Sequence, residues 1–199
     1  MISHWRELQT VLDQGYREID DGTDVPRAAV AAVFRPEEQG RGSELLFIQR
    51  AVKDTDPWSG QMAFPGGRRE HDDPTPRATA ERETIEEVGL DLGRARFLGS
   101  LSELDGGRAT DRRVIVSAHA YWLEGARPVL QPNYEVADVV WVPLRTLGDN
   151  TRYIDYNYPL ADTLFPGIRL DRDGQVIWGL TLRFLSDLFA RLERPFIIG

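Results

Sequence analysis

One segment constrains this chain more than any other: residues 64–90, which read FPGGRREHDDPTPRATAERETIEEVGL. Thr75 and Pro76 are typical of a helix start, and Gly89 is typical of a helix end, so the sequence predicts a helix over 74–88. Because this helix follows a glycine-rich loop, the segment predicts a loop–helix unit that packs on a larger framework.

Three glutamates, Glu83, Glu86 and Glu87, fall near the end of this predicted helix. Positions i, i+3 and i+4 share one helix face, so the three carboxylates project together and repel one another. The helix dipole also disfavours anions at the C-terminal end. Two interpretations are open: a solvated acidic face, or a site for a divalent cation such as Mg²⁺, which prefers hard oxygen ligands. Arg82, four residues before Glu86, can pair with part of the cluster.

The double glycine Gly66-Gly67 favours the second interpretation. Glycine has no side chain to obstruct a phosphate or a metal ion, and it adopts backbone angles that tight turns require. The sequence therefore predicts close backbone approach to a ligand beside the acidic helix.

The remaining pattern predicts an α/β domain with a mixed sheet. Apolar runs predict strands, and apolar spacings of three or four residues predict helices. Ala78, Ile85 and Val88 are expected to form the face of the central helix that packs on the sheet. The expected strands are 27–34, 44–50, 95–101, 114–123 and 138–142, with a loop over 51–67, a hairpin over 167–178 turning at Asp173-Gly174, and flanking helices over about 3–19 and 180–192.

The composition of the chain limits the kinds of ligand and chemistry that can be expected. The 199 residues carry a net charge of −8, which disfavours nucleic acid as a partner but allows a phosphorylated small molecule bound with a cation. The chain has no Cys, which excludes thiolate chemistry and fits a cytoplasmic protein. No apolar run is long enough for a membrane span, and the N-terminus is too charged for a signal peptide.

Residues 82–90, RETIEEVGL, resemble the Nudix hydrolase box, in which a glycine and a spacer precede Arg-Glu-apolar-x-Glu-Glu-x-Gly-apolar. Thr84 stands where a small or apolar residue is usual. The spacer after Gly67 is longer than in the general box, and Glu70 and Asp73 are the acids nearest to the usual spacer glutamate.

The longer spacer resembles the coenzyme A pyrophosphatase-like subgroup of that family. Residues 66–73 (GGRREHDD) and 79–83 (TAERE) follow the subgroup's box, and 45–50 (LLFIQR) and 60–67 (GQMAFPGG) follow the two ends of its upstream signature. The middle of that signature departs, because residues 54–58 lack the expected arginine. The likeness extends over about residues 27–185.

The resemblance implies a single Nudix domain over 1–199, with a mixed β-sheet sandwiched between helices and the two flanking helices as extensions. It implies Mg²⁺- or Mn²⁺-dependent hydrolysis of the diphosphate in a nucleoside diphosphate derivative, with coenzyme A or an acyl-CoA expected first. ADP-ribose, a dinucleotide and a (d)NTP are alternative substrates, and a ligand sensor without catalysis is an alternative function. Homodimers are common in the family, so a homodimer is compatible with the resemblance.

By match to the box, the expected metal ligands are Glu83, Glu86 and Glu87. Arg82 belongs to the same catalytic group. The general base is a box glutamate or an acid from a later loop, Glu135 or Glu103. The expected substrate-binding residues are Arg50, Phe64, Gly66, Gly67 and Arg68. Arg69, Arg112 and Arg113 are further candidates for phosphate contact, and Trp58 is the one tryptophan expected to face the site. His4, His71 and His119 are expected to be structural or surface residues.

Overall fold

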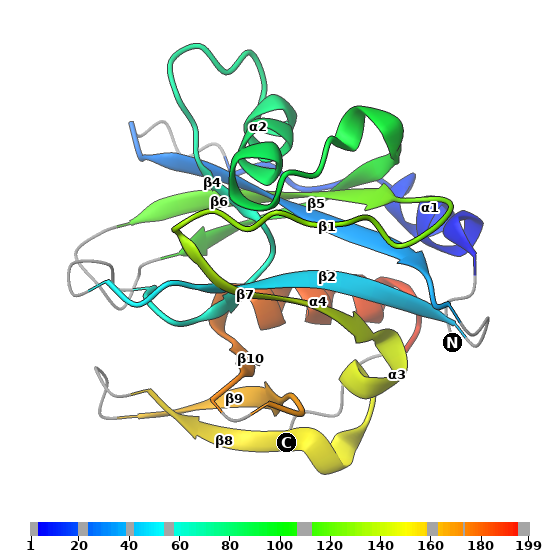
Figure 1. The fold of residues 1–199 in the computed structure, drawn as a ribbon, viewed down its shortest axis with the longest axis vertical. Helices are drawn as coiled ribbons and strands as arrows, with labels where there is room; N and C mark the ends of the chain where they lie inside the picture. Colours follow the sequence, from blue (N-terminus) through cyan, green and yellow to red (C-terminus); the bar gives the residue numbers. More distant parts are fainter. Residues whose placement is uncertain are drawn as a thin grey trace.

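The computed structural model describes residues 4–19, 24–38, 42–53, 58–106, 113–158, 163–172 and 174–194. Figure 1 shows helix α2 on one side of the main strand layer, helix α4 on the other side, and a smaller sheet beyond α4. The predicted α/β architecture, a mixed sheet between helices, is confirmed.

The elements have the following bounds. The helices are α1 (Trp5–Leu12), α2 (Pro76–Val88), α3 (Leu144–Leu147) and α4 (Gly179–Arg191), with 3-10 turns η1 (Leu92–Arg94) and η2 (Asn150–Arg152). The strands are β1 (Arg27–Pro36), β2 (Ser43–Arg50), β3 (Met62–Ala63), β4 (Gly66–Arg68), β5 (Arg96–Gly106), β6 (Val114–Trp122), β7 (Val136–Pro143), β8 (Tyr153–Asn157), β9 (Leu164–Arg169) and β10 (Val176–Trp178). None of the helices in these ranges has the length and apolar content of a membrane span.

Strand β1 organises the larger sheet. It runs parallel to β6 and antiparallel to two other partners, β4 at its start and β2 at its end. The register pairs Ala28 with Arg68 of β4 and Phe34 with Leu45 of β2. One strand therefore connects the glycine-rich segment at one end of the sheet with the β1–β2 turn at the other.

The two faces of β1 carry two hydrophobic clusters. Ala29, Ala31 and Val33 cluster with Ala80 and Val88 of α2. The alternate positions Ala32 and Phe34 belong to the second cluster, together with Leu8 and Leu12 of α1 and Leu185 and Leu188 of α4. Side chains alternate between the faces of a strand, so these small and branched residues bring helices close on both sides.

The N-terminal helix is shorter than predicted, because it ends at Leu12 rather than near residue 19. Gly15 has φ +88, a left-handed conformation that interrupts the helix, and Tyr16 is 46% exposed instead of lying on an apolar face. The following backbone binds β5 instead: Glu103 N donates to Arg17 O over 2.8 Å. Tertiary pairing overrides the helical spacing here.

The predicted loop over 51–67 contains the short strands β3 and β4, and residues 54–57 lie outside the described part of the chain. The predicted hairpin is confirmed as β9 paired with β10, with Asp173 outside the described residues. Strand β8, which completes a second sheet with them, was not predicted. The predicted C-terminal helix is confirmed as α4.

Candidate active site

Helix α2 begins and ends where its sequence predicts. Thr75 is the N-cap, and its side chain accepts a hydrogen bond from Ala78 N over 3.1 Å. Pro76 occupies the first turn, where its missing N–H carries no penalty. Gly89 closes the helix in the left-handed conformation with φ 69.

The buried face of α2 differs from the predicted one. Ile85, expected to pack on the sheet, is 49% exposed, whereas Thr84 and Glu87 are almost completely buried. The apolar spacing pointed to Ile85 because it did not count the charged residue Glu87, the penultimate residue of the helix, as a buried position. The helix instead directs Glu87 and Val88 toward the sheet, so a carboxylate lies in the helix–sheet interface.

The double glycine makes the close approach possible. Gly66 N donates to Glu87 Oε2 over 2.8 Å, and a Cβ on Gly66 would lie 2.3 Å from Ala29 O of β1. A Cβ on Gly67 would lie 2.5–2.6 Å from the Glu83 carboxylate. The prediction that only glycine fits here agrees with this geometry, and the groups that approach are β1 and the two glutamates.

Arg82 binds the surrounding acids into one network. Its Nε and Nη2 donate to the two oxygens of Asp73 over 3.0 and 2.9 Å, and its Nη1 lies 3.0 Å from Glu83 and 3.2 Å from Glu86. Its Nη2 also donates to Arg68 O over 3.0 Å. The guanidinium beside Asp73 holds the pKa of that carboxyl well below its usual range.

Of the acidic residues in the spacer, Asp73 is the one that makes several hydrogen bonds between the spacer and α2. It is 7% exposed and also accepts from Thr79 Oγ1 and Glu70 N, each over 2.9 Å. Arg69, a candidate for phosphate contact, donates to Asp73 O over 3.1 Å. The spacer is therefore attached to the first turns of α2, and Arg69 helps to hold it.

Glu83 and Glu87 are the carboxylates whose protonation the fold alters. Burial raises the pKa of Glu87 to about 7, against the opposing effects of the Gly66 amide and Arg50. Burial also raises the pKa of Glu83, against Arg82. Arg50 Nη1 lies 4.0 Å from Glu87 Oε1, so the predicted site residue at the end of β2 does reach the acidic helix.

Glu135 reaches the same region through a loop that covers the C-terminal end of α2. Gln131 N donates to Val88 O over 2.8 Å, and Asn133 N donates to Glu87 O over 2.9 Å. These bonds satisfy carbonyls that a helix end leaves without partners. Glu135 raises the pKa values of Glu83 and Glu87, because its negative charge lies near theirs.

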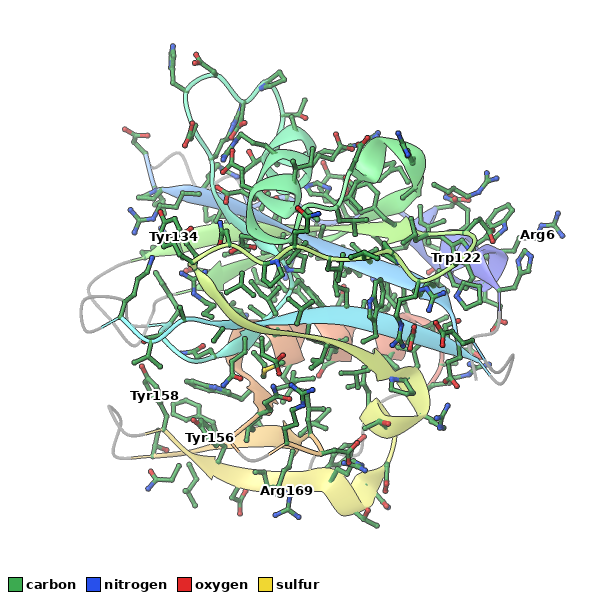
Figure 2. The ribbon with its side chains drawn as sticks, viewed as in Figure 1. Arg6, Trp122, Tyr134, Tyr156, Tyr158 and Arg169 are labelled. Atoms are coloured by element: carbon green, nitrogen blue, oxygen red, sulfur yellow. The ribbon has the colours of Figure 1, made fainter. Side chains whose placement is uncertain are left out.

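Lys53 is a site residue that the sequence did not reveal. Its Nζ lies 2.7 Å from Glu135 Oε1 and 5.0 Å from the centre of the Tyr134 ring, and Tyr134 is labelled in Figure 2. The backbone supports the same contact, since Ala51 N donates to Glu135 O over 2.8 Å. No spacing rule connects these two loops, so only the tertiary structure could identify the pair.

Two other residues that the sequence suggested for the site do not present their side chains to it, and a third lies outside the described part of the chain. Phe64 is 2% exposed and stacks on Phe47 at 5.3 Å, so its side chain supports the site from the core and does not face substrate. Glu103 binds Arg27 at 3.2 Å and Ile19 N at 2.8 Å, which gives its carboxylate a structural use. Arg112 lies outside the described residues.

Of the three histidines, His119 is buried and His4 and His71 are exposed. His4 has a structural use at the start of α1, where its Nδ1 accepts from Arg6 N over 3.2 Å.

The side chain of Arg68 lies on the far face of β4. Neighbouring residues of a strand point to opposite faces, and the position of a Cβ on Gly67 shows that the Gly67 face is the one toward Glu83. Arg68 therefore approaches the glutamates through its backbone carbonyl, not through its guanidinium. Its side chain lines a cavity on the other side of the strand.

The donor set suits a hard divalent cation. Glu83 and Glu87 lie one turn apart against the two glycines of β4, and Mg²⁺ commonly takes one or two protein carboxylates plus substrate phosphates and water. Within the described residues no three His, Asp or Glu side chains converge closely enough to hold a metal by themselves. Glu86 is held by Arg82 and is half-exposed, so its part as a third ligand is still a prediction.

A family model described as the NUDIX domain matches residues 25–163. Among curated proteins, an uncharacterized protein of Schizosaccharomyces pombe is 41% identical over 124 residues, which are 61% of this chain and 33% of that protein. The mitochondrial coenzyme A diphosphatase NUDT8 of Mus musculus is 34% identical over 115 residues, 57% of this chain and 55% of that protein. The chain thus spans only about a third to a half of the length of these relatives.

An uncharacterized Nudix hydrolase NudL of Yersinia pestis is 29% identical over 173 residues, 84% of this chain and 80% of that protein. Among solved structures, a MutT/nudix family protein from Enterococcus faecalis has a TM-score of 0.58 at 16% identity, covering 97% of this chain and 75% of that one. A C. elegans Ap4A hydrolase has a TM-score of 0.50 at 20% identity, covering 62% of this chain and 83% of that one. These structural similarities concern the fold.

Proposed function

Because the chain belongs to the NUDIX family, we propose that it hydrolyses the diphosphate bond of a nucleoside diphosphate derivative in the presence of Mg²⁺ or Mn²⁺. The observation that carries the proposal is the placement of Glu83 and Glu87 against Gly66 and Gly67. A solvated acidic face would not bury Glu87 to 2% exposure or require two glycines beside it.

Glu83 and Glu87 would hold the cation, with Glu86 as a third ligand. The bound cation would neutralise charge on the diphosphate and lower the pKa of a water molecule. Arg82 fixes the carboxylates of Glu83 and Glu86 on one side of the helix, and Arg50 adds positive charge beside Glu87. These residues thus orient the diphosphate and balance its charge.

In the reaction, a bond forms between a water oxygen and one phosphorus, and the bond from that phosphorus to the bridging oxygen breaks. The water must lose a proton, and we assign its acceptance to Glu135 in preference to Glu103. Both carboxylates have a cationic partner, but Glu135 lies close enough to Glu83 and Glu87 to raise their pKa values, whereas Glu103 is buried and is held by Arg27 and the Ile19 amide. A box glutamate is the alternative base.

Coenzyme A or an acyl-CoA is the proposed substrate, with 4′-phosphopantetheine (acylated for an acyl-CoA) and 3′,5′-ADP as products. The proposal is supported by the sequence similarity to the mouse coenzyme A diphosphatase and by the resemblance of residues 60–67 and 79–83 to that subgroup. ADP-ribose, a dinucleotide and a (d)NTP are the alternatives within the same chemistry.

A substrate panel tests the proposal. The full chain is incubated with coenzyme A, an acyl-CoA, ADP-ribose, a dinucleoside polyphosphate and a (d)NTP, with Mg²⁺, Mn²⁺ or EDTA, and products are separated by chromatography. We expect metal-dependent cleavage of coenzyme A or its thioester. Cleavage of ADP-ribose alone would refute the substrate assignment, and binding without turnover of any compound would favour a ligand sensor.

A further inference from the structure

A cavity of about 370 Å³ lies beside the candidate active site on the opposite face of β4. Gly67 faces Glu83, so the next residue, Arg68, points the other way and lines this cavity. The volume falls within the range of pockets that hold small molecules. The cavity is therefore large enough for one half of a substrate whose diphosphate lies at the glutamates.

Three strand ends bring its lining together. The starts of the parallel strands β1 and β6 lie side by side, with Arg27 opposite Ile115, and the end of β4 pairs with β1 at Ala28 and Arg68. The lining residues are consequently far apart in sequence but fixed by the sheet. They include Asp24, Pro26, Trp58, Arg68, Arg113 and Val114.

The lining combines an apolar wall with cations. Pro26, Val114 and the half-buried indole of Trp58, which packs against the main core, provide apolar surface. Aromatic side chains of this kind stack on nucleobases. Trp58 is also the tryptophan that the sequence predicted to face the site, and in the structure its side chain lines this cavity.

Two guanidinium groups stand at this wall. Arg113 is oriented by Asp105, with its Nη2 2.9 Å from Oδ2. The Arg68 guanidinium is exposed and makes no hydrogen bond or ion pair with any residue that the structure describes. Guanidinium groups bind phosphate through paired N–H donors.

We infer that this cavity binds the nucleoside half of the substrate, with the base against Trp58 and a phosphate ester on the sugar between Arg68 and Arg113. The inference rests on the proposed function and deepens it, because it names the residues that would select a nucleoside diphosphate derivative whose ribose carries a further phosphate. Asp24 at the same wall provides an acceptor for an amino or hydroxyl group of the nucleoside.

The reach between the two sites is short. Gly66, whose amide binds Glu87, precedes Arg68 by two residues, which is about 7 Å along the strand, and a substrate that reaches both sites must also cross from one face of β4 to the other. A nucleotide spans this distance, so one substrate can occupy the cavity with its nucleoside and the acidic helix with its diphosphate. The cavity thus separates substrates by their ribose phosphate, at a distance from the bond that breaks.

The binding test uses adenosine 3′,5′-bisphosphate and 5′-AMP as probes, titrated calorimetrically into the full chain in EDTA. We expect the bisphosphate to bind more tightly than 5′-AMP, and Arg68→Gln to weaken the bisphosphate about tenfold while changing 5′-AMP little. Trp58→Leu should weaken both probes. Arg94→Gln, which removes an 87% exposed arginine on η1, is the matched control and should change neither.

Equal affinity of the bisphosphate for the wild type and Arg68→Gln would overturn the inference, as would equal affinity of the two probes for the wild type. Because Trp58 packs against the core, its variant is read only with a circular dichroism melt that matches the wild type, and Arg68→Gln decides the outcome otherwise.

Kinetics distinguish this inference from the proposed function. With any substrate cleaved in the panel that carries a ribose phosphate, Arg68→Gln should raise KM about tenfold with little change in kcat, and the bisphosphate should inhibit competitively. Non-competitive inhibition would indicate a separate effector site and refute a substrate subsite. If no compound is hydrolysed but the bisphosphate still binds through Arg68, the proposed function fails and the cavity assignment stands.

Discussion

Glu87 is the residue on which the proposed chemistry depends most. Its carboxylate is buried between α2 and the glycine strand, where Gln has nearly the same shape. We expect Glu87→Gln to stay folded and to lower kcat/KM about a hundredfold or more, because the variant loses a proposed metal ligand. Glu70→Gln is the control, since that carboxylate is exposed and lies 3.9 Å from Arg82. Full turnover by Glu87→Gln, measured by product chromatography, would disprove the metal assignment.

His119 is expected to make the stability of the fold depend on pH. Burial lowers its pKa to about 4, with Arg77 adding to the decrease and Glu81 opposing it, while the unfolded chain titrates near 6.5. Between these values the unfolded state binds more protons, so stability present above pH 6.5 is lost as the pH falls toward 4. Because the difference is between two and three pKa units, the loss is about 3 kcal/mol.

The variant His119→Gln removes this proton and can keep a hydrogen bond to Ser100, whose Oγ lies 2.9 Å from Nδ1. Urea unfolding of both proteins at pH 7, 5.5 and 4 should show the wild type losing more stability than the variant as the pH falls. Parallel curves for the two proteins would show that His119 does not titrate in this way.

At the scale of elements, the fit between β4 and α2 leaves no space for a methyl group at Gly67. Its φ lies outside the left-handed region, so alanine is tolerated by the backbone, but the Cβ would displace the Glu83 carboxylate. We expect Gly67→Ala to lower kcat/KM at least tenfold while changing the free energy of unfolding by no more than about 2 kcal/mol. Gly148→Ala is the control, since its Cβ meets only ordinary contacts at 3.8–3.9 Å. Unchanged turnover in Gly67→Ala would contradict a role for the Glu83 carboxylate.

The same elements show what local sequence could predict. Thr75, Pro76 and Gly89 set the ends of α2 through chemistry that acts within one turn, so the helix was predicted closely. The side of α2 that is buried depends on β4 and β1, which the spacing of Ile85 and Val88 does not encode. Lys53 was missed for the same reason, because its contact with Glu135 joins two loops.

At the scale of the whole molecule, β1 carries a candidate site at one end and a buried ion network at the other. The mixed sheet and most of its strands followed from apolar runs separated by turn residues, whereas the order of the strands was not predicted. Of the second sheet, the β9–β10 hairpin was predicted, but β8 was not, because β8 pairs only with β9 and its sequence resembles an ordinary polar segment. Figure 2 shows Tyr156 and Arg169 on this sheet and Tyr158 directly after β8, all away from α2.

The ion network at the far end of β1 is expected to contribute to the stability of the fold and not to catalysis. Arg35 and Glu44 are buried and ion-paired, and Arg127 Nη2 binds Glu44 Oε2 at 2.7 Å. Because Glu44→Gln leaves Arg35 buried without its counter-charge, we expect the free energy of unfolding to fall by about 3 kcal/mol. Glu38→Gln, which changes an exposed carboxylate 3.9 Å from Arg127, should change stability little.

Catalysis should respond differently from stability. The network joins β1 and β2 at the edge farthest from β4, so Glu44→Gln should keep the kcat and KM of the wild type at temperatures well below its melting point. Urea unfolding and steady-state kinetics on the same preparation check both halves. A loss of kcat that exceeds the unfolded fraction would mean that strain at one end of β1 reaches Gly66 and Gly67 at the other.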